Sequence, residues 1–255
     1  MEDPGRGARL GGVGLGGVGL GGVGLGGSRV GGTQQQLSGR VAAQLREAIM
    51  VGELRPSTFV RVEHVAAGLG VSATPVREAL MVLHSEGAVR WEPRRGFRVV
   101  PLTRGDVDDL FAVQAHVAGE LAARAALALP PAEVVRLGQV QAAISDAAAR
   151  GDTARVEELN HDVHRTLNRA AGAHRLASML NLFVHYVPRQ YYGRVPGWAD
   201  ATTHDHGAIL EALEKRDAEA ARAAMSEHIL HIGRLLAAHL EATGVLAPAA
   251  EERAG

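Results

Sequence analysis

"GVSATPVREAL", residues 70–80, is the stretch that decides the fold of the first part of the chain. A glycine suited to a tight turn is followed by Ser72 and Thr74, either of which can cap a helix, and by Pro75, which suits a first helical turn. Apolar residues then recur at helical spacing, at Val76, Ala79, Leu80 and Leu83. The pattern predicts a capped helix that buries this face and points Thr74 and Arg77 away from it.

Two helices are predicted before this one. "SGRVAAQLREAIMVG", residues 38–52, has helical periodicity, with Ser38 as a plausible N-cap and Gly52 as the terminator. "VEHVAAGLG", residues 62–70, is a shorter helix with an apolar side. A short helix, a glycine turn and a capped helix form a helix-turn-helix, whose second helix can enter the major groove of DNA.

A basic β-hairpin is predicted after these helices. Residues 89–92 and 97–100 are rich in strand-forming side chains, and a turn carrying Arg94, Arg95 and Gly96 joins them. Such a wing beside a recognition helix can touch phosphates or a minor groove. Arg77 taken alone is more often a solvated surface residue. The ordered combination of helices and wing is far more specific, and it predicts binding to double-stranded DNA.

Composition and charge agree with this organisation. The chain has 255 residues and is 46% hydrophobic, enough for a core. Residues 38–100 hold nine arginines and six acidic residues, a net charge of +3, whereas residues 101–255 carry a net charge of −5. Cysteine is absent, which excludes disulfides and thiolate metal sites and fits a cytoplasmic protein. No apolar run of 18 residues exists, so we expect no membrane-spanning helix.

Both ends of the chain are expected to be flexible. Residues 10–27 read "LGGVGLGGVGLGGVGLGG". Such a glycine-rich segment loses much backbone entropy on folding and has few side chains whose burial could offset that loss. Residues 1–36 are therefore predicted to be a disordered arm. A functional arm, a slippage-type expansion and an overextended coding start are the alternatives. The expected domains are a winged helix-turn-helix at 37–100 and a helical domain at 101–243, followed by a flexible tail at 244–255.

The second domain is predicted to be an all-α bundle, which makes the fold class mainly α. Thr103 with Asp106 is a capping pair for a long helix, and Pro130-Pro131, Gly151-Asp152, Gly172 and Pro196-Gly197 break the later sequence into about six helices. No strand pattern interrupts them. Helical bundles place ligand and metal sites among side chains that face inward from neighbouring helices.

Four polar residues lie on the apolar stripes of these helices. Asn160 and His164 share one helix, and His206 and His228 lie on two others. Taken singly, each histidine is more often a hydrogen-bonded core residue; taken together, they could bind a metal. The other histidines of these helices are interpreted as solvated or incidental, namely His161, His174, His204, His231 and His239.

The chain resembles the GntR family of bacterial transcription regulators, in its FadR subfamily. "QLREAIMVGELRP", "LGVSATPVREAL" and "EGAVRWEPRRGFRVV" carry the resemblance in the first domain, and "NHDVH", "DHGAILEALEKRDAEAA" and "MSEHI" carry it in the second, which resembles an FCD domain. The likeness implies a homodimer on a palindromic operator, DNA contacts from Thr74 and Arg77, and a wing tip at Arg95 and Gly96. Ala73 departs from the family's frequent arginine.

The resemblance also implies a metal and an effector. It assigns Asn160, His164, His206 and His228 as ligands, with Asn160 in place of the usual aspartate. Three imidazoles suit Zn²⁺ or Ni²⁺, with Mn²⁺ as a third candidate. An organic-acid effector is expected in a pocket where His116, four residues before Glu120, replaces a frequent arginine.

The function predicted from the sequence is therefore a ligand-responsive transcription factor rather than an enzyme. The first alternative is a metal-dependent hydrolase that uses the histidines, with Asp162 or Asp205 as the only nearby candidates for a general base; both are expected to face sideways. The second alternative, a helical interaction module, leaves the basic wing unexplained.

Overall fold

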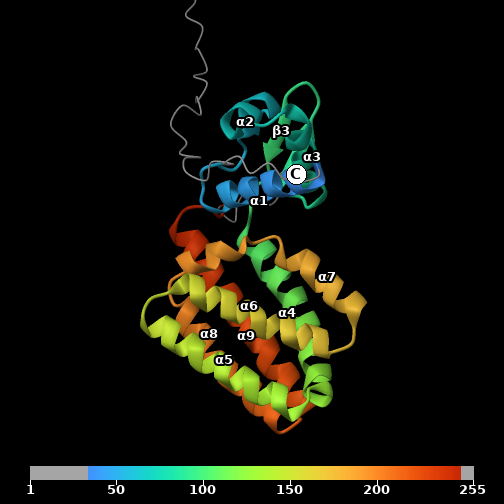
Figure 1. Cartoon of the computed structure of the whole chain (residues 1–255). Coiled ribbons are helices and arrows are strands. Elements are labelled where there is room, and N and C mark those ends of the chain that lie inside the picture. The colour runs from blue at the N-terminus through green and yellow to red at the C-terminus, as the bar shows by residue number, and fades with distance from the viewer. Residues whose placement is uncertain (1–33, 248–255) are drawn as a thin grey trace, which may run out of the picture.

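A computed structural model describes residues 34–247 and shows two domains (Figure 1). The smaller domain holds three helices and a small sheet, and the larger one is a bundle of helices that begins at Arg104. The predicted fold class, mainly α with a winged helix-turn-helix followed by an all-α bundle, is confirmed. Residues 1–33, most of the predicted arm, lie outside the described residues.

The first domain contains the predicted helices and one additional strand. Its elements are α1 (Gln34–Met50), β1 (Phe59–Val60), α2 (Val62–Leu69), α3 (Ala73–Ser85), β2 (Val89–Glu92) and β3 (Gly96–Val99). The strands form an antiparallel sheet in the order β1-β3-β2. Helix α1 begins four residues before Ser38, which is buried inside the helix, so the predicted cap was wrong.

The turn between α2 and α3 follows the sequence pattern. Gly70 has φ of 65°, in the left-handed region that favours glycine, and its N–H bonds carbonyls of α2. Ser72 occupies the N-cap position of α3 with extended backbone angles, although its side chain makes no capping hydrogen bond. The predicted stripe of Val76, Ala79, Leu80 and Leu83 is buried, and Pro75 is buried beside it. This face anchors the helix and leaves the opposite face exposed.

The second domain contains six α-helices and one short 3-10 helix within the described range. They are α4 (Arg104–Ala128), α5 (Pro131–Ala149), α6 (Thr153–Ala170), α7 (His174–Val184), η1 (Arg189–Arg194), α8 (Trp198–Glu214) and α9 (Ala218–Ala242). Thr103 and Asp106 form the predicted capping box: the Thr103 N–H donates to Oδ2 of Asp106 at 2.8 Å, and the Asp106 N–H donates to Oγ1 of Thr103 at 3.1 Å.

Helices α4 and α9 pack closely because glycine lies at two of their contact points. A Cβ added to Gly119 would lie 2.4 Å from Oγ of Ser226, and one added to Gly233 would lie 2.6 Å from Cγ of Phe111. Phe111 is buried in the core of the bundle. The absence of a side chain at these two positions therefore allows α4 and α9 to pack close to each other.

The chain after α9 folds back onto the start of the bundle. Val245 is buried, Leu246 forms a parallel bridge with Leu102, and the Ala247 N–H donates to the carbonyl of Leu102 at 2.8 Å. The predicted flexible tail is thus attached as far as Ala247, and its remainder, 248–255, lies outside the described residues.

A helix that crosses a membrane must pass a test of length and hydropathy. No single helix between residues 34 and 247 is long and apolar enough to cross a membrane. Helices α2 and α3 pass that test together, but they are bent by 118° to one another and form the helix-turn-helix.

Candidate functional site

The exposed face of α3 carries the predicted DNA-contacting residues. Thr74 lies in the first turn and is exposed. Arg77, one turn further on, keeps 66% of its side chain in solvent, and its Nη2 lies 3.9 Å from a carboxylate oxygen of Glu63 on α2. An exposed pair at that distance holds the guanidinium weakly, so the arginine can turn to a base edge or a phosphate.

The wing presents its arginines at a tight turn. Arg94 has φ of 64° and Gly96 has φ of 101°, both in the left-handed region. A Cβ added to Gly96 would also lie 3.2 Å from the carbonyl oxygen of Val60. Arg95 is exposed, and its guanidinium lies 5.3 Å from the ring centroid of Phe59, within cation–π range. The three predicted wing residues therefore form one exposed basic tip.

Two further arginines enlarge this basic surface. Arg90 and Arg98 are paired across β2 and β3, and both side chains are exposed. Arg98 is partly held by Glu92 at 3.6 Å and donates from Nε to the carbonyl of Ser57 at 3.3 Å. Neither arginine is among the predicted DNA-contacting residues, although the alternation of side chains along each strand could have indicated both.

Three histidines from three helices meet inside the bundle. His164 of α6, His206 of α8 and His228 of α9 each offer a ring nitrogen, and these nitrogens all lie within 4.8 Å of one another. The ring centroids are 5.6 Å apart for His164 and His206, 5.4 Å for His164 and His228, and 4.9 Å for His206 and His228. The predicted convergence of the triad is present, and we call these three residues the histidine cluster.

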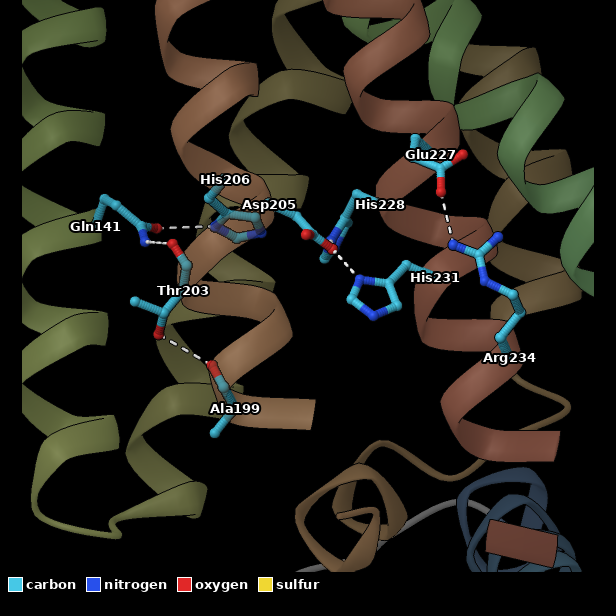
Figure 2. A network of polar contacts seen from close by, with 9 residues as sticks. All are labelled: Gln141, Ala199, Thr203, Asp205, His206, Glu227, His228, His231 and Arg234. Atoms are coloured by element: carbon cyan, nitrogen blue, oxygen red, sulfur yellow. Dashed lines mark hydrogen bonds and ion pairs between the residues drawn. The ribbon is translucent and has the colours of Figure 1, made fainter. Parts of the chain in front are cut away.

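The ring of His206 is oriented by an amide on α5 (Figure 2). Gln141 donates from Nε2 to the carbonyl of Thr203 at 2.9 Å, so its Oε1 is the acceptor that faces Nδ1 of His206, also at 2.9 Å. Nδ1 of His206 must therefore carry the proton. Its buried Nε2 has no hydrogen-bond partner among residues 34–247 and keeps a free lone pair.

The ring of His228 is oriented by a carboxylate on α8. Oδ2 of Asp205 lies 3.2 Å from Nδ1 of His228 and 2.9 Å from Nδ1 of His231 (Figure 2). An ionised carboxylate only accepts hydrogen bonds, so Nδ1 of His228 is the donor and its Nε2 is left for another partner. Asp205 was expected to face sideways and His231 to be solvated or incidental; the contacts with His228 and with each other were not predicted.

Burial keeps two members of the cluster, His164 and His206, uncharged. Desolvation, followed by the neighbouring histidines, lowers the pKa of His164 to about 3 and holds the pKa of His206 well below its ordinary value. His206 and His228 are almost completely buried. Neutral imidazoles at physiological pH have free lone pairs, which is the protonation state that metal binding requires.

The donor atoms present fit a divalent transition metal. Oδ1 of Asn160 and Oγ1 of Thr202 are buried and, like Nε2 of His206, without a hydrogen-bond partner in the described part of the chain. Asn160 precedes His164 by one helical turn, and Thr202 precedes His206 by one turn, so each shares a face with a cluster histidine. Unsatisfied buried polar atoms beside three imidazoles are what a metal and its bound ligand would satisfy.

The predicted effector residue, His116, is an exposed side chain of α4. Glu120, one turn later, accepts a 2.7 Å hydrogen bond from Nε of Arg222 on α9. The candidates for a hydrolytic base are engaged as well, because Asp162 is ion-paired with Arg136 and Arg165, both at 2.9 Å.

A cavity lies at the junction of the two domains. It has a volume of about 440 Å³ and is walled by Met50 of α1, Val100 and Leu102 of the connecting segment, and Leu110 and Tyr186 of the bundle, among others. An ion pair between Arg194 of η1 and Glu47 of α1, at 3.3 Å, also crosses this junction. Met50 is also buried in the core cluster of the bundle, so the junction combines apolar packing, an ion pair and a cavity.

Comparisons with known proteins agree with this division. Residues 37–99 match the family model described as "Bacterial regulatory proteins, gntR family", and residues 109–231 match the FCD domain. The chain is 31% identical over 213 residues to the "Probable D-xylose utilization operon transcriptional repressor" of Paenarthrobacter nicotinovorans, covering 80% of this chain and 88% of that protein.

Two further comparisons concern one Escherichia coli protein. The chain is 24% identical over 195 residues to the HTH-type transcriptional regulator McbR of strain K12, covering 75% of this chain and 88% of that protein. The solved structure named "E. coli McbR/YncC" matches with a TM-score of 0.60 at 22% identity, covering 80% of this chain and 98% of that one. At this identity the structural match supports the fold alone.

Proposed function

Because the chain belongs to the GntR family of transcription regulators and carries an FCD domain, we propose that it binds a palindromic operator as a homodimer and responds to a small organic acid bound at a metal ion. The domains and relatives are those of transcription regulators, not of enzymes. The proposal therefore concerns the symmetry of the DNA site, the metal and the effector.

The observation that carries the proposal is that one domain presents an exposed arginine on α3 and an exposed basic wing tip. The exposed face of α3 presents Thr74 and Arg77, and the wing tip presents Arg94 and Arg95. Arg77 lies 3.9 Å from Glu63, and Arg95 lies 3.8 Å from Glu92 and 5.3 Å from the ring centroid of Phe59. A helix of this kind reads base edges in a major groove, whereas the wing touches backbone or minor groove. A two-fold symmetric dimer would read two half-sites of opposite orientation.

The sensing role is proposed for the histidine cluster. His164, His206 and His228 would hold a divalent ion, Zn²⁺ or Ni²⁺ before Mn²⁺, with Asn160 as a fourth, neutral donor. When bound, the ion supplies a Lewis-acidic centre that accepts the carboxylate oxygens of an organic acid. Thr202 would donate its otherwise unpartnered hydroxyl to the same ligand. Gln141 would keep the lone pair of His206 directed at the ion.

Effector binding would act on DNA through the domain junction. A ligand that binds one relative pose of the domains more tightly than another shifts the population toward that pose. The cavity beside α1 lies at this junction, where Met50 of α1 packs into the core of the bundle and the Arg194–Glu47 ion pair crosses between the domains. In a dimer, a change in pose alters the separation of the two recognition helices and hence the affinity for a site of fixed spacing.

In vitro selection from a random duplex library tests the DNA part. We expect the full chain to enrich a sequence with dyad symmetry, and its binding to weaken as salt rises because phosphate contacts release counterions. Sedimentation of the complex should give two chains per duplex. Enrichment of no sequence, or of an asymmetric site bound by one chain, would contradict the proposal.

A further inference from the structure

The histidine cluster provides no negative charge of its own. Its members, His164, His206 and His228, are imidazoles, and Asn160 beside them is an amide, so none of these groups is an anion. A divalent ion held by these groups would bring two positive charges into the interior of a helical bundle, where an uncompensated charge is costly. Some nearby anion must offset this charge if the ion is to remain bound before any effector arrives.

Asp205 is the carboxylate in hydrogen-bond contact with a cluster histidine in the described part of the chain. Its Oδ2 lies 3.2 Å from Nδ1 of His228 and 2.9 Å from Nδ1 of His231, which is not a member of the cluster (Figure 2). Asp205 keeps 14% of its side chain exposed, compared with 36% for His231 and 2% for His228. The carboxylate thus lies between the buried histidine and a half-exposed one, with little water around it.

The geometry makes this carboxylate a double acceptor, because Oδ2 of Asp205 faces Nδ1 of both His228 and His231. A carboxylate that accepts a hydrogen bond from Nδ1 fixes the tautomer of an imidazole and makes its Nε2 a more basic metal ligand. Gln141 fixes the tautomer of His206 in the same way but adds no charge.

Resting on the metal site proposed above, we propose that Asp205 is the positioning residue that directs Nε2 of His228 at the ion and supplies the negative charge that the direct ligands lack. His231 would be its outer partner and would keep the carboxylate in place on the side away from the cluster. The negative charge that compensates the ion is therefore carried by the carboxylate of Asp205 on α8, which is hydrogen-bonded to a ligand and does not itself coordinate the ion.

The test is a competition titration of the full, metal-free chain with Zn²⁺ against a chromophoric chelator. Asp205→Asn keeps an oxygen that can accept from His228 but removes the charge, and we expect the Kd for Zn²⁺ to rise about tenfold. Asp205→Ala also removes the acceptor, and we expect a rise of about 100-fold. The absorption bands of bound Co²⁺ should change in both variants, because the ring of His228 is no longer held.

Asp162→Asn is the matched control. It makes the same chemical change on α6, two residues before His164, but its carboxylate binds Arg136 and Arg165. We expect its Kd to stay within about threefold of the wild-type value. Melting of the metal-free variants shows whether each one folds, and Asp205→Asn, being isosteric, should fold if Asp205→Ala does not.

The Zn²⁺ titrations separate failure of the metal site from failure of the role of Asp205. If the wild-type chain does not bind Zn²⁺, the proposed metal site and this inference both fail. If the wild-type chain binds Zn²⁺ and Asp205→Asn binds it equally well, or Asp162→Asn weakens it as much, the metal site stands and the role of Asp205 is refuted.

Discussion

Replacing His206 with alanine should abolish the stabilisation of the protein by Zn²⁺. In the wild-type chain, an ion that binds the folded state alone at 100 times its Kd adds about 2.7 kcal/mol to the free energy of unfolding. For a domain of this size, 1 kcal/mol corresponds to about 2–4 °C, so Zn²⁺ should raise the melting temperature by about 5–11 °C. His206→Ala removes one of three imidazole donors, and the shift should fall to near zero.

The metal-free variant has its own expected cost. His206 is 1% exposed, and its removal leaves Oε1 of Gln141 without its partner in the interior. An unsatisfied buried acceptor costs about 1–3 kcal/mol, so metal-free His206→Ala should melt lower than the metal-free wild type. The test is therefore the difference between melts with and without Zn²⁺, measured for each protein by circular dichroism.

His204→Ala is the matched control for this experiment. His204 lies on the same helix, two residues earlier, and is exposed. It should keep the full Zn²⁺-induced shift. A wild-type chain whose melt does not respond to Zn²⁺, or a His206→Ala chain that retains the wild-type shift, would refute the reasoning.

Two further predictions concern packing and pH. Gly233→Ala should lower the free energy of unfolding by about 1–3 kcal/mol, because the new Cβ would collide with the buried ring of Phe111. Gly207→Ala, where the new Cβ meets nothing within 4 Å, should stabilise the helix by up to about 1 kcal/mol. The free energies of unfolding in urea test both changes, and a Gly233→Ala chain more stable than Gly207→Ala would contradict the prediction. The hydrogen bond from Arg222 lowers the pKa of Glu120, so this pair stabilises the fold above the ordinary carboxyl pKa and is lost as pH falls through the lowered value. Glu120→Gln should therefore lose less stability than the wild type between pH 6 and pH 3, and equal losses in urea midpoints would contradict this.

The parts of the fold that local signals determine could be predicted from the sequence. The left-handed turn at Gly70, the Thr103–Asp106 capping box and the stripe of α3 depend on residues within a few positions of one another. The convergence of the three histidines could also be predicted, because each lies on the apolar stripe of its own helix.

What could not be predicted depends on partners far away in the sequence. The two-residue strand β1 is a strand only because β3 pairs with it. Ser38 has the chemistry of an N-cap, but the glutamines before it extend the helix. Asp205 lies about 100° around α8 from His206 and was expected to face sideways. On that side of α8 the neighbouring helix is α9, where His228 and His231 lie about one turn apart. The contact of Asp205 with them depends on how the two helices pack.

The central claim, that the exposed face of α3 reads DNA, is tested most directly by a mobility-shift titration of the selected duplex with Arg77→Ala. Loss of a base contact costs about 1–3 kcal/mol, so the Kd should rise about 5- to 150-fold while the melting temperature stays unchanged, because Arg77 is mostly exposed. Arg175→Ala removes the same charge from an exposed position on α7 and should change the Kd less than twofold. An Arg77→Ala chain that binds the duplex as tightly as the wild type, or no more weakly than Arg175→Ala, would contradict the assignment of α3 as the recognition helix.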